Sequence, residues 1–552
     1  MTKNSQKDFT AGREEEMTTA NAGGAVFKVD SWVQMERFLV LGTESGTYYV
    51  NSGQLTKDNA INTLKCLKKN PQKAIKMIVD VSEQGRSYKN DATLFALALA
   101  TAVDDVATRK MAFDALPKVA RTASHLFTFV GFMTSFRGWG KAARKAIAAW
   151  YLDKDANSLA YQMIKYQQRN GWSHRDLLRL SHPVVESADK EALFRYSISG
   201  IDSLGDIERK VSQGKGNPLL IKGRRDLTGF LPAQAEAFEE IKKLDSSDIT
   251  QAVKLIEEYA LPREAVPTHF LKEKEVWAAL LERMPMTAMI RNLATMTRIG
   301  LLDSTEYEAK VLASLTNEAV LKKARIHPLQ MLIALKTYSQ GKGMKGNNTW
   351  NVNSNVVDAL DKGFYKTFSN VTPTNKPTLL ALDVSGSMTW YASGIEGLTA
   401  MEATAAMAMV TLAVEADATV VGFMDKIKEL DIRKEKTLSG VLRKMQNLPF
   451  GATDCAAPFL WAKERNLKFE NFAVYTDNET GSGSYWGGYR GSEKPSVALQ
   501  KYRDATGIPA KLVVLATSVT DFSIADPKDA GMMDICGFDG SVPQVINDFF
   551  AR

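Results

Sequence analysis

The first two thirds of the chain repeat a helical pattern of hydrophobic residues. Apolar residues recur every three or four positions in segments of about 10 to 20 residues, and Gly, Pro or Asn separates the segments. Clear examples are residues 94–105, 141–151, 275–296 and 327–338. A helical array of about 340 residues exceeds one compact bundle, so length and periodicity predict stacked helix pairs in the manner of HEAT repeats. No sequence repeat is evident.

After residue 370 the pattern changes to short β-rich apolar runs that alternate with helical stretches. The runs span residues 377–385, 418–425, 471–478 and 510–517, and the helical stretches span residues 401–416 and 493–506. Runs that are apolar on both faces suit strands covered by helices on each side. This part therefore predicts an α/β domain with a mostly parallel sheet.

These patterns divide the chain into three expected parts. Residues 1–24 are polar, lack the apolar core of a secretory signal and are expected to be disordered. Residues 25–370 form the expected helical domain, and residues 371–552 form the expected α/β domain. The boundary follows the linker-like composition of residues 372–377, TPTNKP.

Composition adds limits to this picture. The net charge of +7 over 552 residues permits an anionic partner without demanding one. Cys66, Cys455 and Cys536 are widely spaced, so neither a disulfide framework nor a thiolate zinc site is expected. No apolar run approaches the roughly 18 residues that cross a bilayer. We expect a reducing, cytoplasmic compartment and no membrane partner.

Hydroxyl and carboxyl side chains gather where the strands of the α/β domain end. Asp383 ends the first run, and Ser385 and Ser387 follow at a spacing that lets both point the same way. Thr453 lies in a GATDC loop, and Asp477 follows the third run. Because ligands gather at the carboxyl ends of parallel strands, all five are expected to reach one face. Their hard oxygen ligands predict a divalent cation, with Mg²⁺ as the expected ion.

The order of these motifs resembles the metal-ion-dependent adhesion site of von Willebrand factor A domains. In that family the site binds a divalent cation directly or through water and leaves a position open for a partner's carboxylate. The alternative is a Ser/Asp-capped helix start without a metal. A phosphatase of the haloacid-dehalogenase type would use Asp383 as its nucleophile but needs an acid where Ser385 stands. We therefore expect a protein that is not an enzyme.

The densest cationic stretch of the helical part lies at residues 164–183. Lys165 and Arg169 are four residues apart, which predicts a shared helix face. After the Asn170-Gly171 break, further cations recur at spacings of four and three. These are Arg175, Arg179 and His182. Such cations can contact several phosphates of a nucleic acid, but charge alone favours a solvated helix face.

The phrase KYxxRxGWSHRDLLRLSHP, which spans residues 165–183, resembles a signature of the TROVE module found in Ro autoantigens. Other family-like motifs follow in order along nearly the whole chain. In the helical part these motifs lie at residues 37–55, 268–302 and 324–346. In the α/β part they are GATDC, TDNET and IADPKDAGMMDICGFD. Several long motifs in register are more specific than any single motif, so we expect a member of the Ro autoantigen family.

This resemblance implies a ring of HEAT-like repeats closed by the A-type domain. Ro proteins bind small noncoding Y RNAs on the outer ring surface and the single-stranded ends of misfolded structured RNAs in the central hole. By motif, the positions tied to Y RNA binding are Lys165, Arg169 and His182. Further RNA contacts are expected from Arg121, His125, Lys141 and Arg144.

The resemblance also implies the partners. We expect a Y or Y-like RNA, misfolded structured RNA with a single-stranded 3′ end, and, as in bacterial members, polynucleotide phosphorylase. No DNA partner is expected, and the protein is expected to be monomeric within a ribonucleoprotein that acts in noncoding RNA quality control or decay. The alternative is a metal-dependent protein-interaction scaffold without a specific RNA ligand.

Overall fold

A computed structural model describes residues 12–552 apart from a set of short gaps. The gaps are residues 43–51, 88, 186, 206, 213–217, 344–346, 369–370, 392–396, 434, 436–439, 442–443, 445–452, 482–492 and 519. Among the described residues, no helix is both long and apolar enough to cross a membrane. Cys66, Cys455 and Cys536 are buried free thiols.

The chain divides into two compact units. The first unit holds Met1–Asn70, Asp80–Ala92 and Leu312–Arg552, and the second holds Pro71–Val79 and Thr93–Val311. Helices from the N-terminal half of the chain therefore belong to the same unit as the C-terminal sheet, and this division does not follow the boundary expected near residue 370. The closed ring stays a prediction.

The first unit contains the expected mostly parallel sheet. Its strands run in the order β13-β11-β10-β7-β8-β9, and every neighbouring pair is parallel except β8 with β9. The strands are β7 Thr378–Asp383, β8 Ala418–Phe423, β9 Ile427–Glu429, β10 Asn471–Thr476, β11 Lys511–Ala516 and β13 Met532–Cys536. The sequence prediction of an α/β domain is confirmed.

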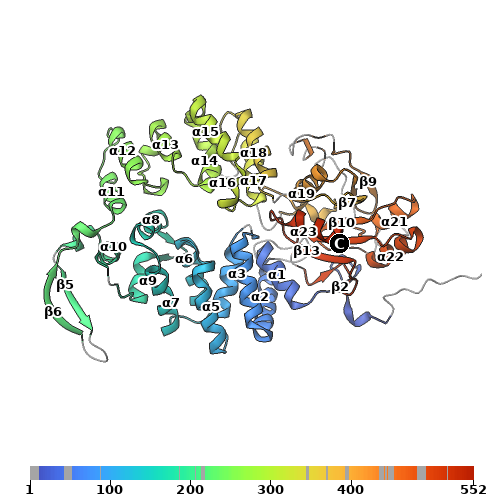
Figure 1. Ribbon diagram of the computed structural model, residues 1–552, viewed down its shortest axis with the longest axis horizontal. Helices are drawn as coiled ribbons and strands as arrows, with labels where there is room; N and C mark the ends of the chain where they lie inside the picture. Colours follow the sequence, from blue (N-terminus) through green and yellow to red (C-terminus); the bar gives the residue numbers. More distant parts are fainter. Residues whose placement is uncertain are drawn as a thin grey trace, which may run out of the picture. The chain divides into compact units, whose positions relative to one another are not determined.

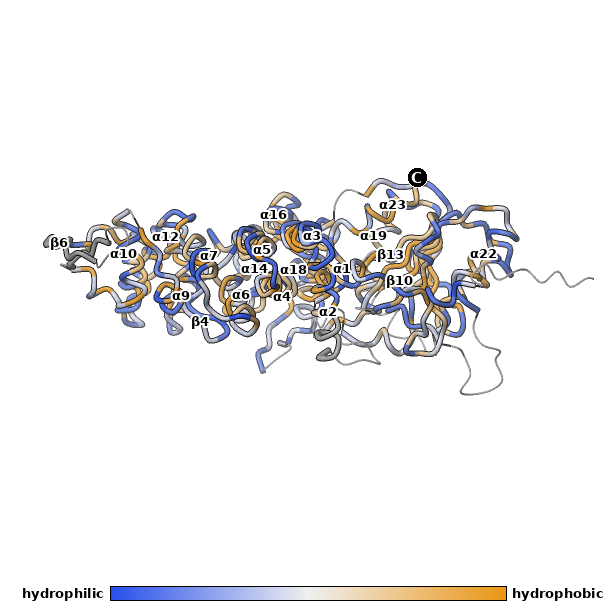
Figure 2. The backbone as a smooth tube through the Cα atoms, turned by 90° about the horizontal axis from the view of Figure 1, so that it is seen from below, coloured by the Kyte–Doolittle hydropathy of each residue, from blue (hydrophilic) through white to orange (hydrophobic). Residues whose placement is uncertain are grey.

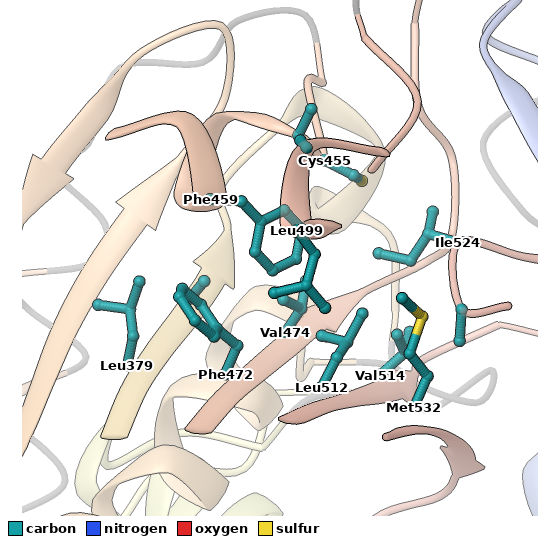
Figure 3. Packing of buried hydrophobic residues seen from close by; sticks show 14 of the residues in the cluster. Leu379, Cys455, Phe459, Phe472, Val474, Leu499, Leu512, Val514, Ile524 and Met532 are labelled. Atoms are coloured by element: carbon teal, nitrogen blue, oxygen red, sulfur yellow. The ribbon is translucent and has the colours of Figure 1, made fainter. Parts of the chain in front are cut away.

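Both faces of this sheet are buried, which explains the unbroken apolar runs of its strands. Leu379 of β7 packs into one core cluster with residues of α21 and α22, as Figure 3 shows for several of its members. Leu380, which points to the opposite face, is fully buried as well, and α19 contacts β7. Figure 2 shows the hydrophobic colour concentrated on β10 and β13. The helices of this domain are α19 Ala400–Val414, α21 Ala457–Glu464, α22 Pro495–Thr506 and α23 Val542–Ala551.

The start of the chain forms a second, three-stranded sheet with the C-terminal domain. β1 Met17–Thr19 pairs antiparallel with β2 Ala25–Lys28, and β2 pairs with β12 Phe522–Ser523. The expected disordered lead-in covered residues 1–24. Residues 1–11 lie outside the described residues, whereas residues 12–24 include β1 and a short 3-10 turn, Glu14–Glu16.

One buried arginine fastens the first helix, α1 Ser31–Leu41, to this domain. Arg37 is fully buried, and its guanidinium donates at 2.8 Å to the carbonyl oxygens of Thr520 and Phe522. It also forms an ion pair with Asp534 of β13, at 2.5 Å. A buried charge needs such partners because burial removes its hydration. The position of α1 therefore depends on this guanidinium.

Two further ion pairs join the N-terminal part of the chain and helix α17 to the C-terminal domain. Arg86 contacts Asp539 at 3.2 Å and Glu36 of α1 at 2.7 Å. Lys336 of α17 contacts both carboxylate oxygens of Glu402 in α19 at 2.7 Å. The remaining helices of this unit are α2 Ser52–Lys69, α16 Glu318–Lys323, α17 Pro328–Ser339 and α18 Ser354–Lys366.

The second unit is the predicted helical array, and Figure 1 shows its helices lying side by side in chain order. Asp105, Thr122 and Asp155 each cap the helix that follows by accepting a backbone N–H bond, as expected of these residue types. Its helices are α5 Val106–Val119, α6 Ala123–Phe136, α7 Lys141–Leu152, α8 Ala156–Lys165, α9 His174–Ser181, α10 Ala188–Ser199, α11 Ala233–Ile241, α12 Ile249–Tyr259, α13 Lys274–Leu281 and α14 Met286–Arg298. Helices α3 Pro71–Gln84, α4 Asp91–Ala100 and α15 Thr305–Leu315 cross between the units.

Two β-hairpins interrupt these helices. The first pairs β3 Gln168–Arg169 with β4 Trp172–Ser173 and packs against α6. The second pairs β5 Ile207–Ser212 with β6 Pro218–Arg225. Neither was predicted from the sequence pattern, in which both regions were assigned to the helical part.

Replacing Arg37 with Met should lower the free energy of unfolding of the first unit by about 3 to 5 kcal/mol, because the mostly buried Asp534 loses its cation and the carbonyl oxygens of Thr520 and Phe522 lose their donor. Urea unfolding would measure the change. The matched control is Lys322→Met, since Lys322 and Glu318 form an exposed pair and such a pair contributes less than about 1 kcal/mol. Equal effects of the two substitutions would contradict the anchoring role of Arg37.

Candidate functional site

Asp383 lies at the end of β7, at the centre of the predicted metal site. Its carboxylate is fully buried and accepts bonds from the backbone N–H of Ser385 at 2.9 Å and from the hydroxyl of Thr476 at 2.7 Å. The hydroxyls of Ser385 and Ser387 lie 3.0 Å apart. Alternate residues of the loop thus turn the same way, as predicted.

Asp477 brings a second buried carboxylate to this loop from the end of β10. One of its oxygens accepts the backbone N–H of Glu479 at 3.0 Å, while Oδ2 is buried without a hydrogen-bond partner. Burial, and next the charge of Asp477, raise the pKa of Asp383 well above its usual value. Burial also raises the pKa of Asp477. The two carboxylates are therefore close, and none of the described Lys or Arg side chains pairs with either of them.

Thr453 is buried near these groups, and it forms a hydrogen bond through its backbone. Its carbonyl oxygen accepts the backbone N–H of Gly481 at 2.8 Å. Two residues later, the Cys455 thiol lies 3.8 Å from the hydroxyl of Thr476. Because Thr476 bonds to Asp383, the loop that carries Thr453 borders the two carboxylates.

Sequence reasoning missed Glu479 as a component of this site. Glu479 is fully buried and accepts bonds from the side chain of Asn21 at 2.6 Å and from the backbone N–H of Ala22 at 3.1 Å. Burial raises its pKa to about 7. The backbone N–H of Gly24 also donates to the carbonyl of Thr480 at 2.7 Å, where a Cβ on Gly24 would lie 2.3 Å from that oxygen. The TDNET motif contains Glu479, so its position near Asp477 was visible in the sequence. Its hydrogen-bond partners, Asn21 and Ala22, lie in the segment that was expected to be disordered.

The donor set of this site fits a divalent cation. Within the described ranges, no group of three or more His, Cys, Asp or Glu side chains is arranged to hold a metal ion. The site instead combines two buried carboxylates with the hydroxyls of Ser385 and Ser387, a combination that suits Mg²⁺. The orphaned Oδ2 of Asp477 is the atom that most needs a cation.

In the helical array, Lys165 and Arg169 do not share a helix face, and that prediction is wrong. Helix α8 ends at Lys165, and Arg169 lies on β3. Asn170 and Gly171 both have positive φ, 52° and 77°. Two central residues of this kind form the turn that best joins short antiparallel strands, and Asn-Gly is its strongest signal. The dipeptide marks a hairpin and not a simple break between helices.

Arg169 lies close to Arg121 and His125, two other predicted contacts. His125 sits in the first turn of α6, and burial, followed by the charges of Arg121 and Arg169, lowers its pKa to about 4. Its Nδ1 atom is buried without a hydrogen-bond partner. The hairpin and the start of α6 therefore present two cations close together.

Arg175 and Arg179 are exposed one turn apart on α9, as predicted. The nearby acid Asp176 does not neutralise them, because its carboxylate accepts the backbone N–H and the hydroxyl of Ser173 in a capping box. In the described part of the chain, neither arginine forms an ion pair. His182 ends α9, exposed and in the left-handed conformation.

Lys165 lies in different surroundings. Its ammonium donates to the hydroxyl of Tyr161 at 2.9 Å and lies 5.6 Å from the ring centroid of Tyr166. Burial alone would lower its pKa, but the bond to Tyr161 and the charge of Glu264 contribute to a net rise. It lines a cavity of about 310 Å³ together with residues of α12, α13 and α14 and with Arg263 of the 3-10 turn Arg263–Ala265. Lys165 is therefore a charged cavity residue.

Lys141 and Arg144 are exposed at the start of α7. Trp139, which precedes them, lies 5.9 Å from Trp172 of β4, measured between ring centroids. This contact brings the start of α7 to the β3–β4 hairpin. The predicted contacts thus form a cationic surface on α6, α7, the β3–β4 hairpin and α9, which we call the hairpin surface. Its members are Arg121, Lys141, Arg144, Arg169, Arg175 and Arg179.

His174 holds this surface together, although sequence reasoning passed over it. It is buried; its Nε2 lies 3.0 Å from the carbonyl oxygen of Tyr166 and its Nδ1 lies 2.9 Å from the hydroxyl of Tyr151. A carbonyl oxygen only accepts, so Nε2 carries the proton and Nδ1 accepts from Tyr151. His174 thus joins α7, α9 and the end of α8.

Comparison with known proteins finds matches along nearly the whole chain. A family model described as the TROVE domain matches residues 18–261 and 231–337, and one described as the Ro60 vWA domain matches residues 378–550. RNA-binding protein RO60 of Caenorhabditis elegans is 38% identical over 589 residues, which cover 96% of this chain and 89% of that protein. RNA-binding protein RO60 of Deinococcus radiodurans is 38% identical over 541 residues, with 97% and 96% covered.

A solved structure agrees with these matches. The crystal structure of the Deinococcus radiodurans RO (RSR) protein is similar to this chain with a TM-score of 0.66 and 35% identity, and the match covers 95% of this chain and 99% of that one.

The buried His174 should make stability depend on pH. Burial lowers its pKa from 6.5 to about 4 in the folded protein, so the unfolded chain binds the proton more readily. Its contribution is present above pH 6.5 and is lost as the pH falls toward 4. Between pH 7 and pH 5 the loss should be about 2 kcal/mol. Urea unfolding should show a pH dependence that is weaker by this amount in His174→Gln; parallel curves would contradict the assignment.

Proposed function

We propose that this chain, which belongs to the Ro60 family, works as an RNA-binding protein and not as an enzyme. The observation that carries the proposal is the hairpin surface, where the exposed Arg175 and Arg179 form no ion pair with any of the described residues. Asp176, the nearest acid in sequence, is occupied by the capping box. A polyanion would supply the missing negative charge.

The proposed mechanism is binding through the RNA backbone. Arg169 and Arg121 lower the pKa of His125 by their charges, so the surface holds positive potential that phosphates would reduce. Arginine suits this task because its planar guanidinium pairs with phosphate oxygens in a fork and also stacks on exposed bases. Trp172 and Trp139 lie beside these cations. The contacts position the RNA, and its shape provides selection.

The finer proposal concerns the kind of RNA. By family resemblance, a small noncoding Y-type RNA would occupy the hairpin surface, with Arg169 and His182 as direct contacts and Lys165 reached through its cavity. Misfolded structured RNAs with single-stranded 3′ ends would be the second class of ligand. This would place the protein, as a monomer in a cytoplasmic ribonucleoprotein, in noncoding RNA quality control or decay.

We also propose a divalent cation, Mg²⁺, at the end of β7. Asp383, Ser385, Ser387 and Asp477 would hold it, with Thr453 at its border. The support is the pair of buried carboxylates and the orphaned oxygen of Asp477. When bound, the cation would offer a coordination position to a partner's carboxylate, and polynucleotide phosphorylase is the partner that the family resemblance suggests.

Replacing Arg169, Arg175 and Arg179 together with Gln should weaken RNA binding and its dependence on salt. Each lost phosphate contact lowers the slope of log affinity against log salt by about 0.7 for a single strand and about 0.9 for a double helix, so three contacts remove about 2 to 3. Fluorescence anisotropy of a labelled small structured RNA, titrated at several salt concentrations, measures both quantities.

The matched control replaces three cations of the C-terminal domain, Lys428, Arg465 and Lys468, with Gln. It removes the same charge from exposed or loosely paired positions and should leave the slope unchanged. Equal losses in both variants would mean that net charge, and not the hairpin surface, governs binding. No RNA binding by the unaltered protein would favour the protein-interaction scaffold.

Replacing Asp477 with Asn should abolish binding of the divalent cation. The substitution keeps the shape of the side chain but removes one of the two charges that hold the ion. Equilibrium dialysis against Mn²⁺, followed by elemental analysis, measures bound metal per chain. Asp548→Asn, at an exposed position of α23, is the control. Equal metal content in Asp477→Asn and the unaltered protein would contradict the site.

A further inference from the structure

The tip of the β1–β2 hairpin, residues 20–24, lies against the loop that follows β10, residues 477–481. The backbone N–H of Gly24 donates to the carbonyl oxygen of Thr480 at 2.7 Å. A Cβ atom on Gly24 would lie 2.3 Å from that carbonyl oxygen, so only glycine fits this close approach. Two segments that are distant in the chain therefore pack backbone against backbone.

The Glu479 side chain joins this loop to the tip. Its carboxylate is fully buried; one oxygen accepts the side-chain N–H of Asn21 at 2.6 Å, and the other accepts the backbone N–H of Ala22 at 3.1 Å. A carboxylate removed from water needs donors of this kind, and such charge-assisted bonds are stronger than neutral ones. Asn21 is itself exposed, so it covers the buried acid. The tip therefore fixes the direction of the Glu479 side chain.

The backbone of Glu479 is tied to the predicted metal ligands. Its N–H donates to Oδ1 of Asp477 at 3.0 Å, and its carbonyl oxygen accepts the thiol of Cys455 at 3.5 Å. Two residues further on, the backbone N–H of Gly481 donates to the carbonyl oxygen of Thr453 at 2.8 Å. This segment thus connects the loop that carries Asp477 to the loop that carries Thr453.

The bond from Glu479 also decides which oxygen of Asp477 is available to a ligand. Oδ1 accepts the Glu479 N–H, whereas Oδ2 is buried and has no hydrogen-bond partner among the described residues. A cation would supply the partner that this oxygen lacks. Loss of a group that orients a metal ligand by hydrogen bonding typically lowers metal affinity by about 10- to 100-fold. Cation affinity therefore reports how well Asp477 is oriented.

We propose that the β1–β2 tip positions the metal ligands, with Asn21 and Ala22 holding Glu479 and with Glu479 orienting Asp477. This role rests on the cation site proposed at the end of β7 and extends that site to the N-terminal segment. Asn21 and Glu479 are positioning residues, since neither is a proposed ligand of the cation. Because coupling between two binding events is reciprocal, cation binding would also strengthen the docking of the tip.

The simpler alternative is that the tip only attaches the N-terminal segment to the α/β domain. Other contacts already provide that attachment, because β2 pairs with β12 and Arg13 forms an ion pair with Asp526 at 2.6 Å. These contacts keep the hairpin docked when the Asn21 side chain is removed. A change in cation affinity in such a variant therefore comes from the tip itself.

Replacing Asn21 with Ala should weaken binding of Mn²⁺ by about tenfold, the lower end of the range for lost orienting bonds. Equilibrium dialysis of the full chain over a series of Mn²⁺ concentrations measures the affinity. Thr19→Ala, at an exposed position of β1, is the matched control and should bind Mn²⁺ as tightly as the unaltered chain. Asn21→Asp/Glu479→Gln reverses donor and acceptor, so it should bind more tightly than Asn21→Asp, in which two carboxylates face each other.

Hydrogen exchange tests the reciprocal effect in the unaltered chain. The amides of residues 17–28 should exchange more slowly when Mg²⁺ is added, and this protection should be absent in Asp477→Asn. Equal Mn²⁺ affinity in Asn21→Ala and the unaltered chain would overturn the proposal, as would a reversed pair that binds no better than Asn21→Asp. Exchange that Mg²⁺ does not change would also overturn it. If the unaltered chain binds no Mn²⁺, the proposed cation site itself fails, and the positioning role fails with it.

Discussion

The buried guanidinium of Arg37 determines how the first unit is assembled. A charge without water must be paired and hydrogen-bonded, and Arg37 finds its partners on the loop around Thr520 and on Asp534 of β13. These contacts fix α1 against the C-terminal domain. Once α1 is fixed, the strands before it can pair with β12, and Arg86 can bridge Glu36 and Asp539. The N-terminal segment is thus built into the α/β domain.

The two candidate sites present opposite electrostatic situations. At the end of β7, burial raises the pKa of both Asp383 and Asp477, and the charge of Asp477 raises that of Asp383 further. One oxygen of Asp477 has no hydrogen-bond partner among the described residues. On the hairpin surface, Arg175 and Arg179 are exposed, and the Asp176 carboxylate beside them serves the capping box. The first arrangement suits a small ion held among buried groups, where electrostatic interactions are stronger than in water. The second suits a large, hydrated polyanion whose binding depends on salt. Each site thus lacks the charge that its proposed ligand brings.

Sequence patterns predicted the elements that depend on local periodicity. The strands Thr378–Asp383 and Asn471–Thr476 have apolar residues at their central positions because both faces of the sheet are covered, and these apolar runs are visible in the sequence. The loop that carries Asp383, Ser385 and Ser387 was predictable because it comes directly at the end of an apolar strand. Contacts between distant segments were not predictable: strand β1 has three residues and exists because β2 and β12 complete its sheet. The β3–β4 hairpin was predictable from Asn170-Gly171, but the spacing of Lys165 and Arg169 favoured a helix.

The pairing of the first strands with the last domain has a consequence for synthesis. Arg13 contacts Asp526, 513 residues further along the chain. At about 5 to 20 residues per second, a ribosome needs about 25 to 100 s to make that stretch. During this time β1 and β2 are outside the ribosome without their partner strand, and the loop that Asn21 buttresses does not yet exist. β2 therefore keeps an unpaired edge until the last domain emerges, and unpaired strand edges are prone to aggregation.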